Sequence, residues 1–212
     1  QAEGLIEFML SDLPGRLRPV GRLDALDAVG ERALAHYAAQ DAGALDTDAL
    51  SRRARALHLI GEIASQRGQM DRAAQVFEQA AQSTAELLAR APDDGQRLFD
   101  HAQSAFWVGQ GARLRGRQDE AEAGFRQYLA LARRLGRQAP QRVDWRAEEA
   151  FALQTLGVLL QETARPQESL QALTEAVRLL RPLAAQQPAL YTDLVQTLGA
   201  VAWGHEELGD YT

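Results

Sequence analysis

The chain has 212 residues, of which 46% are hydrophobic and 25% are charged, and its net charge is −6. It contains no cysteine, which excludes disulfide frameworks, thiolate metal sites and cysteine nucleophiles. The acidic balance offers no basic field to a nucleic acid, so we expect no nucleic-acid partner. No apolar run approaches the roughly 18–20 residues that a membrane span requires, so we expect no direct membrane insertion.

The apolar pattern of residues 1–45 predicts two short helices. Apolar side chains from Leu5 to Leu13 give the first helix its buried face, and those from Leu23 to Tyr37 give the second helix its own. We expect the pair to form an N-terminal helical cap on the remainder of the fold, residues 46–212. The alternative, a helix that lies on an anionic membrane, is disfavoured because no basic residue precedes Arg16.

From residue 46 onward the pattern is helical. Valine and isoleucine are sparse and asparagine is absent, whereas the good helix formers Ala, Leu, Arg, Glu and Gln predominate. Apolar residues recur three and four positions apart, as at Leu57, Ile60 and Ala64. Glycine and proline interrupt this pattern at intervals that leave room for helices of roughly 15–22 residues. The sequence therefore predicts an all-α fold.

One unit recurs along these helices. The segment 57–68 has counterparts at 105–116 and 153–164, 48 residues apart, and a last one at 198–209, after another 45. In the first three segments a glycine occupies the same mid-helix position: Gly61, Gly109 and Gly157. A glycine inside a helix costs about 1 kcal/mol relative to alanine, so its recurrence in one phase indicates a close approach of two helices. The repeats are predicted at residues 50–92, 96–139, 143–187 and 190–212, the last one incomplete.

These segments resemble tetratricopeptide repeats, whose pattern places Leu-Gly on the first helix and Ala, an aromatic residue and Ala on the second. The resemblance implies a right-handed α-solenoid of antiparallel helix pairs. Because the period is 48 residues and not 34, we expect a variant with long helices. The residues expected to pack the two helices of a repeat together are Gly61, Gly109, Gly157, Phe77 and Phe125.

The ends of the sequence suggest a fragment. The chain begins with Gln1 and stops at Gly209-Asp210-Tyr211-Thr212, in the middle of a repeat unit. All 23 basic residues are arginine, which is typical of a GC-rich bacterial gene. We expect a piece of a larger bacterial signalling protein, located in the cytoplasm, with a parent chain that could be membrane-anchored.

The resemblance also implies a binding surface, because the first helix of each repeat lines the concave side of such arrays. A peptide-binding groove is predicted there, with exposed rings at Phe106 and Phe151. Its residues are Arg55, His58, Glu62, Gln103, Phe106, Gln110, Arg113, Phe151, Gln154 and Gln161. The clamp with which some relatives hold chaperone C-termini is missing, since His58 and Glu62 stand where Lys and Asn are expected.

Residues with catalytic or metal-binding chemistry form no recognisable motif. The four histidines, among them His101 and His205, lack metal-ligand spacing, so no metal or cofactor is expected. Carboxylate pairs such as Glu148-Glu149 are interpreted as helix-end or solvent-facing groups. The leading hypothesis is a non-enzymatic scaffold that binds a protein or peptide partner. The alternatives are self-assembly as a homo-oligomer through the open C-terminal end, a regulatory module of a signalling protein and, remotely, an enzyme.

Overall fold

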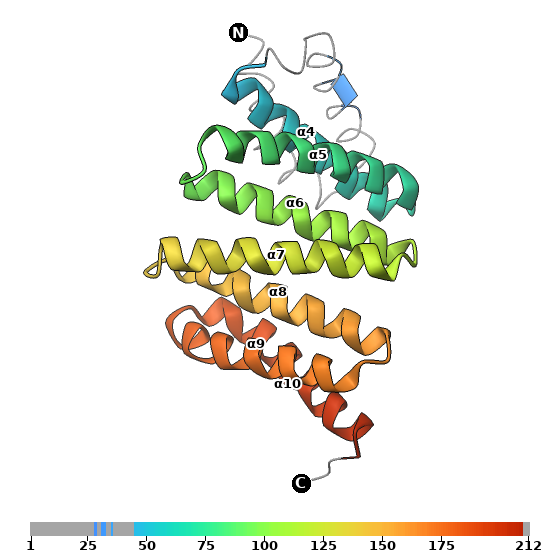
Figure 1. The fold of residues 1–212 in the computed structure, drawn as a ribbon, viewed down its shortest axis with the longest axis vertical. Helices are drawn as coiled ribbons and strands as arrows, with labels where there is room; N and C mark the ends of the chain where they lie inside the picture. The colour runs from blue at the N-terminus through green and yellow to red at the C-terminus, as the bar shows by residue number, and fades with distance from the viewer. Residues whose placement is uncertain (1–27, 29–30, 33–34, 36–44, 210–212) are drawn as a thin grey trace. The chain divides into compact units, whose positions relative to one another are not determined.

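The computed structural model describes residues 28, 31–32, 35 and 45–209 (Figure 1). The predicted N-terminal cap therefore falls almost entirely outside the described residues. The chain divides into two compact units, residues 1–115 and 116–212. Over the described residues the secondary structure is helical, with no strand, which confirms the prediction of an all-α fold.

Each unit is a row of consecutive helices that run antiparallel to their neighbours (Figure 1). The helices of the first unit whose bounds lie within the described residues are α4 (Thr47–Gln66), α5 (Met70–Arg90) and α6 (Gly95–Leu114). Residues 116–212 contain α7 (Gln118–Gln138), α8 (Val143–Glu162), α9 (Pro166–Gln186), the 3₁₀ turn η3 (Pro188–Leu190) and α10 (Tyr191–Glu207). The helices α4, α6, α8 and α10 begin 48 residues apart, at Thr47, Gly95, Val143 and Tyr191.

Two of these helices have an aspartate as their N-cap residue. The side chain of Asp46 accepts a hydrogen bond from the backbone N–H of Ala49 at 2.8 Å, at the start of α4. Asp94 accepts from the N–H groups of Gln96 and Arg97 at the start of α6. Each cap satisfies N–H groups that have no partner within the helix, and a cap of this kind stabilises a helix by about 1 kcal/mol.

A residue with a left-handed backbone conformation follows each of the helices α4, α6, α8 and α10. Gly68, Gly116 and Gly209 have φ values of 72–74°, which suit a residue without a Cβ. Ala164 occupies the equivalent position after α8 with φ 57°, although alanine rarely adopts this conformation. The hydrogen bond from the N–H of Arg165 to the carbonyl of Leu160, 2.9 Å, closes the turn around Ala164.

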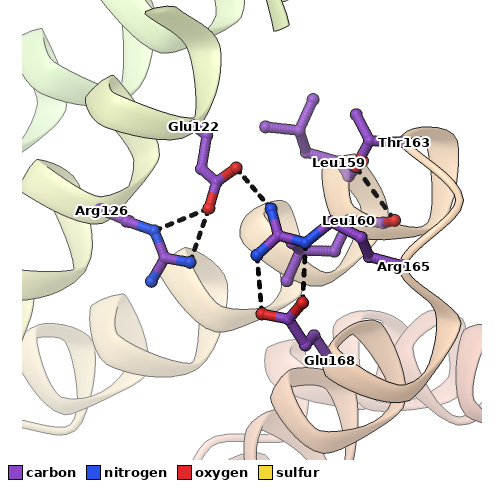
Figure 2. Close-up of polar contacts among 7 residues, drawn as sticks. All are labelled: Glu122, Arg126, Leu159, Leu160, Thr163, Arg165 and Glu168. Carbon is purple, nitrogen blue, oxygen red and sulfur yellow. Dashed lines mark hydrogen bonds and ion pairs between the residues drawn. The ribbon is translucent and has the colours of Figure 1, made fainter. Parts of the chain in front are cut away.

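Ion pairs hold that turn in place (Figure 2). Arg165 donates to both carboxylate oxygens of Glu168 at 2.7 Å and to Glu122 of α7 at 2.7 Å. Arg126 donates to the same Glu122. Although partial burial raises the pKa of Glu122, the hydrogen bonds from the two arginines bring it below its ordinary value. The cluster therefore fixes the α8–α9 turn against α7.

Small residues bring the helices of a pair into close contact. A Cβ at position 61 would lie 2.7 Å from Cδ1 and 2.8 Å from Cζ of Phe77 on α5. At position 157 it would lie 2.7 Å from Cγ of Leu173 on α9. Gly109 is helical and buried in α6, and Phe125 is fully buried in α7.

One carboxylate is buried in this packing. Glu148 is 8% exposed in α8 and accepts a hydrogen bond from the hydroxyl of Tyr128 in α7. The sequence-based interpretation of Glu148 as a solvent-facing group was therefore wrong. A phenol opposite a carboxylate can compensate part of the cost of burying it, whereas the amino-acid pattern alone shows only a charged residue inside a helix.

Candidate functional site

A pocket with a volume of about 220 Å³ opens between α4, α5 and α6. We call it the α4–α6 pocket. Its walls combine positive, negative, amide and aromatic side chains, together with a few apolar ones. They are Ser51, Ala54, Arg55, His58, Glu62, Thr84, Leu87, Asp100, Gln103 and Trp107.

Helical spacing places these groups on facing walls. On α4, Arg55, His58 and Glu62 follow one another at intervals of three and four residues, so they share one helix face. On α6, the same intervals align Asp100, Gln103 and Trp107. The two stripes face each other across the pocket because α4 and α6 both pack against α5.

A chain of buried hydrogen bonds forms the floor. Nε2 of His58 lies 2.8 Å from Oγ of Ser104, which lies 3.0 Å from Oγ1 of Thr84, and Thr84 lies 3.1 Å from Nδ1 of His101. Ser104 also donates to the carbonyl of Asp100. Thr84 Oγ1 in turn lies 3.1 Å from the carbonyl oxygen of Ala81, so each of the two hydroxyls has a backbone acceptor as well as side-chain partners. The network ties α4, α5 and α6 together.

Burial sets the charge states around this floor. It lowers the pKa of His58 from 6.5 to about 4, and it also lowers the pKa of His101. Both rings are therefore neutral near pH 7. Burial raises the pKa of Asp100, against the opposing effects of a hydrogen bond from Gln96 and the positive charge of Arg55.

The Ser104–His58 pair has the separation of a nucleophile and a base, but its surroundings suit a structural role. Ser104 is 0% exposed, and its hydroxyl already donates to a backbone carbonyl. A base with a pKa of about 4 is also a weak proton acceptor at neutral pH. The pair therefore holds helices together and does not present a reactive hydroxyl to the pocket.

Trp107 gives the pocket a rigid aromatic wall. Its ring stacks on Phe77 with centroids 4.8 Å apart and an interplanar angle of 15°. Phe106 meets the same indole edge-on at 5.1 Å. Since Phe77 is 1% exposed, the indole rests on the core and has little freedom to turn away.

The structure brings four of the predicted groove residues together in this pocket: Arg55, His58, Glu62 and Gln103. Phe106, Gln110 and Arg113 lie on α6 outside its lining, and Phe151, Gln154 and Gln161 lie on α8 in the second unit. The expectation of exposed rings at Phe106 and Phe151 was wrong. Both are half-buried, and Phe151 packs against the core of α8, α9 and α10.

Sequence reasoning did not identify Asp100 and Trp107 as pocket residues. The sequence contains one weak indication of their position. Asp100 and Trp107 lie three residues before and four residues after Gln103, so they share its helix face. An indole at helical spacing enters a protein core as readily as it lines a pocket, so the pattern alone favours neither.

A second, more open pocket of about 570 Å³ lies between α8 and α10 in residues 116–212. It includes the predicted residue Gln161, whose amide lies 3.5 Å from Glu207. The exposed indole of Trp203 and the backbone at Gly199 form its opposite side. Both pockets thus lie beside first helices of predicted repeats.

The described residues contain no group of three or more His, Asp or Glu side chains that could hold a metal ion. None of their helices combines the length and the apolar character needed to cross a bilayer.

Comparisons with known proteins add the following. A family model for the tetratricopeptide repeat matches residues 54–86, and no curated protein matches the chain. BtubC (BKLC) from P. vanneervenii superposes with a TM-score of 0.75 at 20% identity, over 99% of this chain and 75% of that chain. The TPR-like repeats of a putative kinesin light chain from Podosopora anserina give 0.70 at 16% identity, over 99% and 89%. The apo form of RapI gives 0.71 at 11% identity, over 97% and 65%. At these identities the likeness shows the fold.

Proposed function

Because residues 54–86 match the tetratricopeptide-repeat model and the fold is that of helical-repeat proteins, we propose that the chain is a non-enzymatic interaction scaffold of this kind whose α4–α6 pocket holds a peptide segment of a protein partner. Helical-repeat proteins of this kind generally mediate protein–protein interactions through the surfaces of their stacked helices. The observation that carries the finer proposal is the convergence of Arg55, His58, Glu62 and Gln103 beside the ring of Trp107.

The chemistry of the pocket suits a peptide backbone. Gln103 offers both an amide donor and an acceptor, Arg55 offers donors and Glu62 offers acceptors. An extended peptide presents alternating N–H and C=O groups that such side chains can satisfy. The hydrogen-bonded floor holds the walls in position before binding, which reduces the ordering cost of association.

The charges of the pocket favour a peptide with a basic side chain. The lining of the pocket contains two carboxylates, Glu62 and Asp100, and one guanidinium, that of Arg55. A Lys or Arg side chain could place its cation between the carboxylates and over the face of Trp107, where the ring attracts positive charge.

The proposal is tested with peptides selected from a random display library on the folded protein. We expect selected peptides to contain a basic residue, and Glu62→Gln/Gln103→Ala to weaken their binding about tenfold or more. The matched control is Glu86→Gln/Gln82→Ala, which changes the same side-chain types on the exposed side of α5, outside the pocket. Equal affinities for wild type and the pocket variant would refute the assignment.

The same assay tests whether the groove extends along α6. If it does, Phe106→Ala/Arg113→Ala weakens the binding of the selected peptides without unfolding the domain. Unchanged affinity in this variant would restrict the site to the α4–α6 pocket.

Self-association is the second candidate function, and the surface of α10 favours it. Tyr191, Val195 and Leu198 lie on one stripe of that helix with 51%, 64% and 38% exposure. Exposed apolar stripes of this kind often mark interfaces. Self-association predicts a molar mass that rises with concentration in light scattering and returns to the monomer value in Val195→Glu. A concentration-independent monomer would exclude it.

A further inference from the structure

A pocket in the second unit gathers positive charge. It has a volume of about 540 Å³ and lies between the C-terminal half of α7, the N-terminal half of α8 and the C-terminal half of α9. We call it the arginine pocket. Four guanidinium groups line it against one carboxylate, although the whole chain carries a net charge of −6. These residues are Arg133, Arg137, Arg146, Arg178 and Glu149.

Two of the arginines are held by carboxylates. Nε of Arg133 lies 3.0 Å from Oε1 of Glu149, and Arg178 forms two hydrogen bonds to Glu175 at 2.6 and 2.7 Å. The hydrogen bond from Arg178 lowers the pKa of Glu175, and the charges of Arg178 and Arg133 lower it further, although partial burial raises it. Arg133 and Arg178 are therefore oriented before any ligand arrives.

The other two arginines retain their full hydrogen-bonding capacity. The side chains of Arg137 and Arg146 form no hydrogen bond or ion pair with the residues that the structure describes. Arg137 is exposed on α7, and Arg146 is half-buried at the start of α8. A half-buried guanidinium without a carboxylate partner gains more from an incoming anion than an exposed one does, because less water surrounds it.

The shape of the pocket admits more than a single ion. The short side chains at Gly136, Pro140 and Pro182 leave the space between the arginines open, and Leu179 adds an apolar surface. Since water takes about 30 Å³ per molecule in the liquid, 540 Å³ is room for several side chains of a peptide.

We propose that the arginine pocket binds an acidic peptide segment of a protein partner, with successive Asp or Glu carboxylates on Arg137 and Arg146. Guanidinium groups form two parallel hydrogen bonds to a carboxylate, which gives such contacts both strength and geometry. A nucleic-acid backbone is the less suitable polyanion, because the rest of this acidic chain repels it. This second surface goes beyond the α4–α6 pocket and has the opposite charge preference.

The test uses a fluorescein-labelled hexaglutamate peptide and fluorescence anisotropy at low and near-physiological ionic strength. We expect saturable binding that weakens with salt and falls about tenfold or more in Arg137→Ala/Arg146→Ala. The matched control, Arg117→Ala/Arg181→Ala, removes two positive charges from the same unit outside the pocket and should bind like wild type. Because Arg137 and Arg146 have no hydrogen-bonding partner among the residues that the structure describes, the pocket variant should melt within about 2 °C of wild type.

Several results would overturn the proposal. They are the absence of hexaglutamate binding, an equal loss in the control variant, displacement by millimolar inorganic phosphate, and tighter binding of an oligothymidylate through the same two arginines. The Glu62→Gln/Gln103→Ala variant separates this site from the first one. It should bind hexaglutamate like wild type whether or not the α4–α6 pocket accepts peptides.

Discussion

Replacing Gly61 with alanine tests the packing of α4 against α5. The added Cβ would lie 2.7 Å from Cδ1 of Phe77, and the ring has no free space, because it is 1% exposed and stacks on Trp107. Overpacking of this kind costs about 1–3 kcal/mol, and a disturbed ring stack costs about 0.5–1.5 kcal/mol more. The higher helix propensity of alanine offsets about 1 kcal/mol of this cost. We therefore expect a net loss of about 2 kcal/mol in unfolding free energy.

Urea denaturation measures this loss, and a chain of this size should also melt about 4–8 °C lower. The matched control is Gly199→Ala in α10, where an added Cβ meets nothing within 4 Å. That variant should gain up to about 1 kcal/mol. Enlarging the space with Phe77→Leu should reduce the cost of alanine at position 61. A Gly61→Ala variant as stable as wild type, or more so, would refute the close-packing argument.

Three further outcomes follow from the geometry. Ala164→Gly should stabilise the protein by about 1 kcal/mol in urea titrations, because φ is 57° there and glycine adopts it without a steric penalty; a loss of stability would contradict this. The pKa of His58 is about 4 in the folded protein and 6.5 in the unfolded chain. Between pH 6.5 and pH 4 the unfolded state therefore binds more protons than the folded state does. The free energy of unfolding should fall by about 2 kcal/mol as the pH is lowered from about 7 to about 5. His58→Gln should reduce that fall, and the part that remains should include the contribution of His101, whose pKa burial also lowers. Tyr128→Phe leaves the buried Glu148 without its phenol donor and should cost about 1.5–3 kcal/mol, whereas an unchanged unfolding midpoint would show that the bond contributes nothing.

Local chemistry explains why the helices and their turns could be predicted from the sequence. Apolar residues that recur every three and four positions predict a helix. The turns after these helices need a left-handed backbone conformation, which favours glycine, as found at Gly68, Gly116 and Gly209. Ala164 could be assigned to the equivalent position because it lies one repeat period of 48 residues after Gly116. Alanine itself does not favour a left-handed conformation, so its residue type gave no indication of the turn. The groove residues of α4 follow from the same periodicity, and Arg55, His58 and Glu62 do share one pocket.

Other features depend on contacts between helices that the pattern does not encode. Trp107 lines a pocket because Phe77 supports its ring from α5, and Glu148 is buried because Tyr128 of α7 faces it. Phe151 has the spacing of a groove residue, yet it packs against the core beneath α9 and α10. In each case the outcome is decided by a partner distant in sequence, which a single sequence does not reveal.

The three tryptophans of the chain allow a direct test of where a selected peptide binds. Trp107 lines the α4–α6 pocket, Trp145 is 8% exposed beneath the guanidinium of Arg142, and Trp203 is 63% exposed on α10. Their three indole N–H signals can be followed in a ¹⁵N–¹H correlation spectrum during titration with the peptide. We expect the Trp107 signal to move while those of Trp145 and Trp203 stay in place. A shift confined to Trp203, or saturable binding with an unmoved Trp107 signal, would contradict the assignment of the α4–α6 pocket as the peptide site.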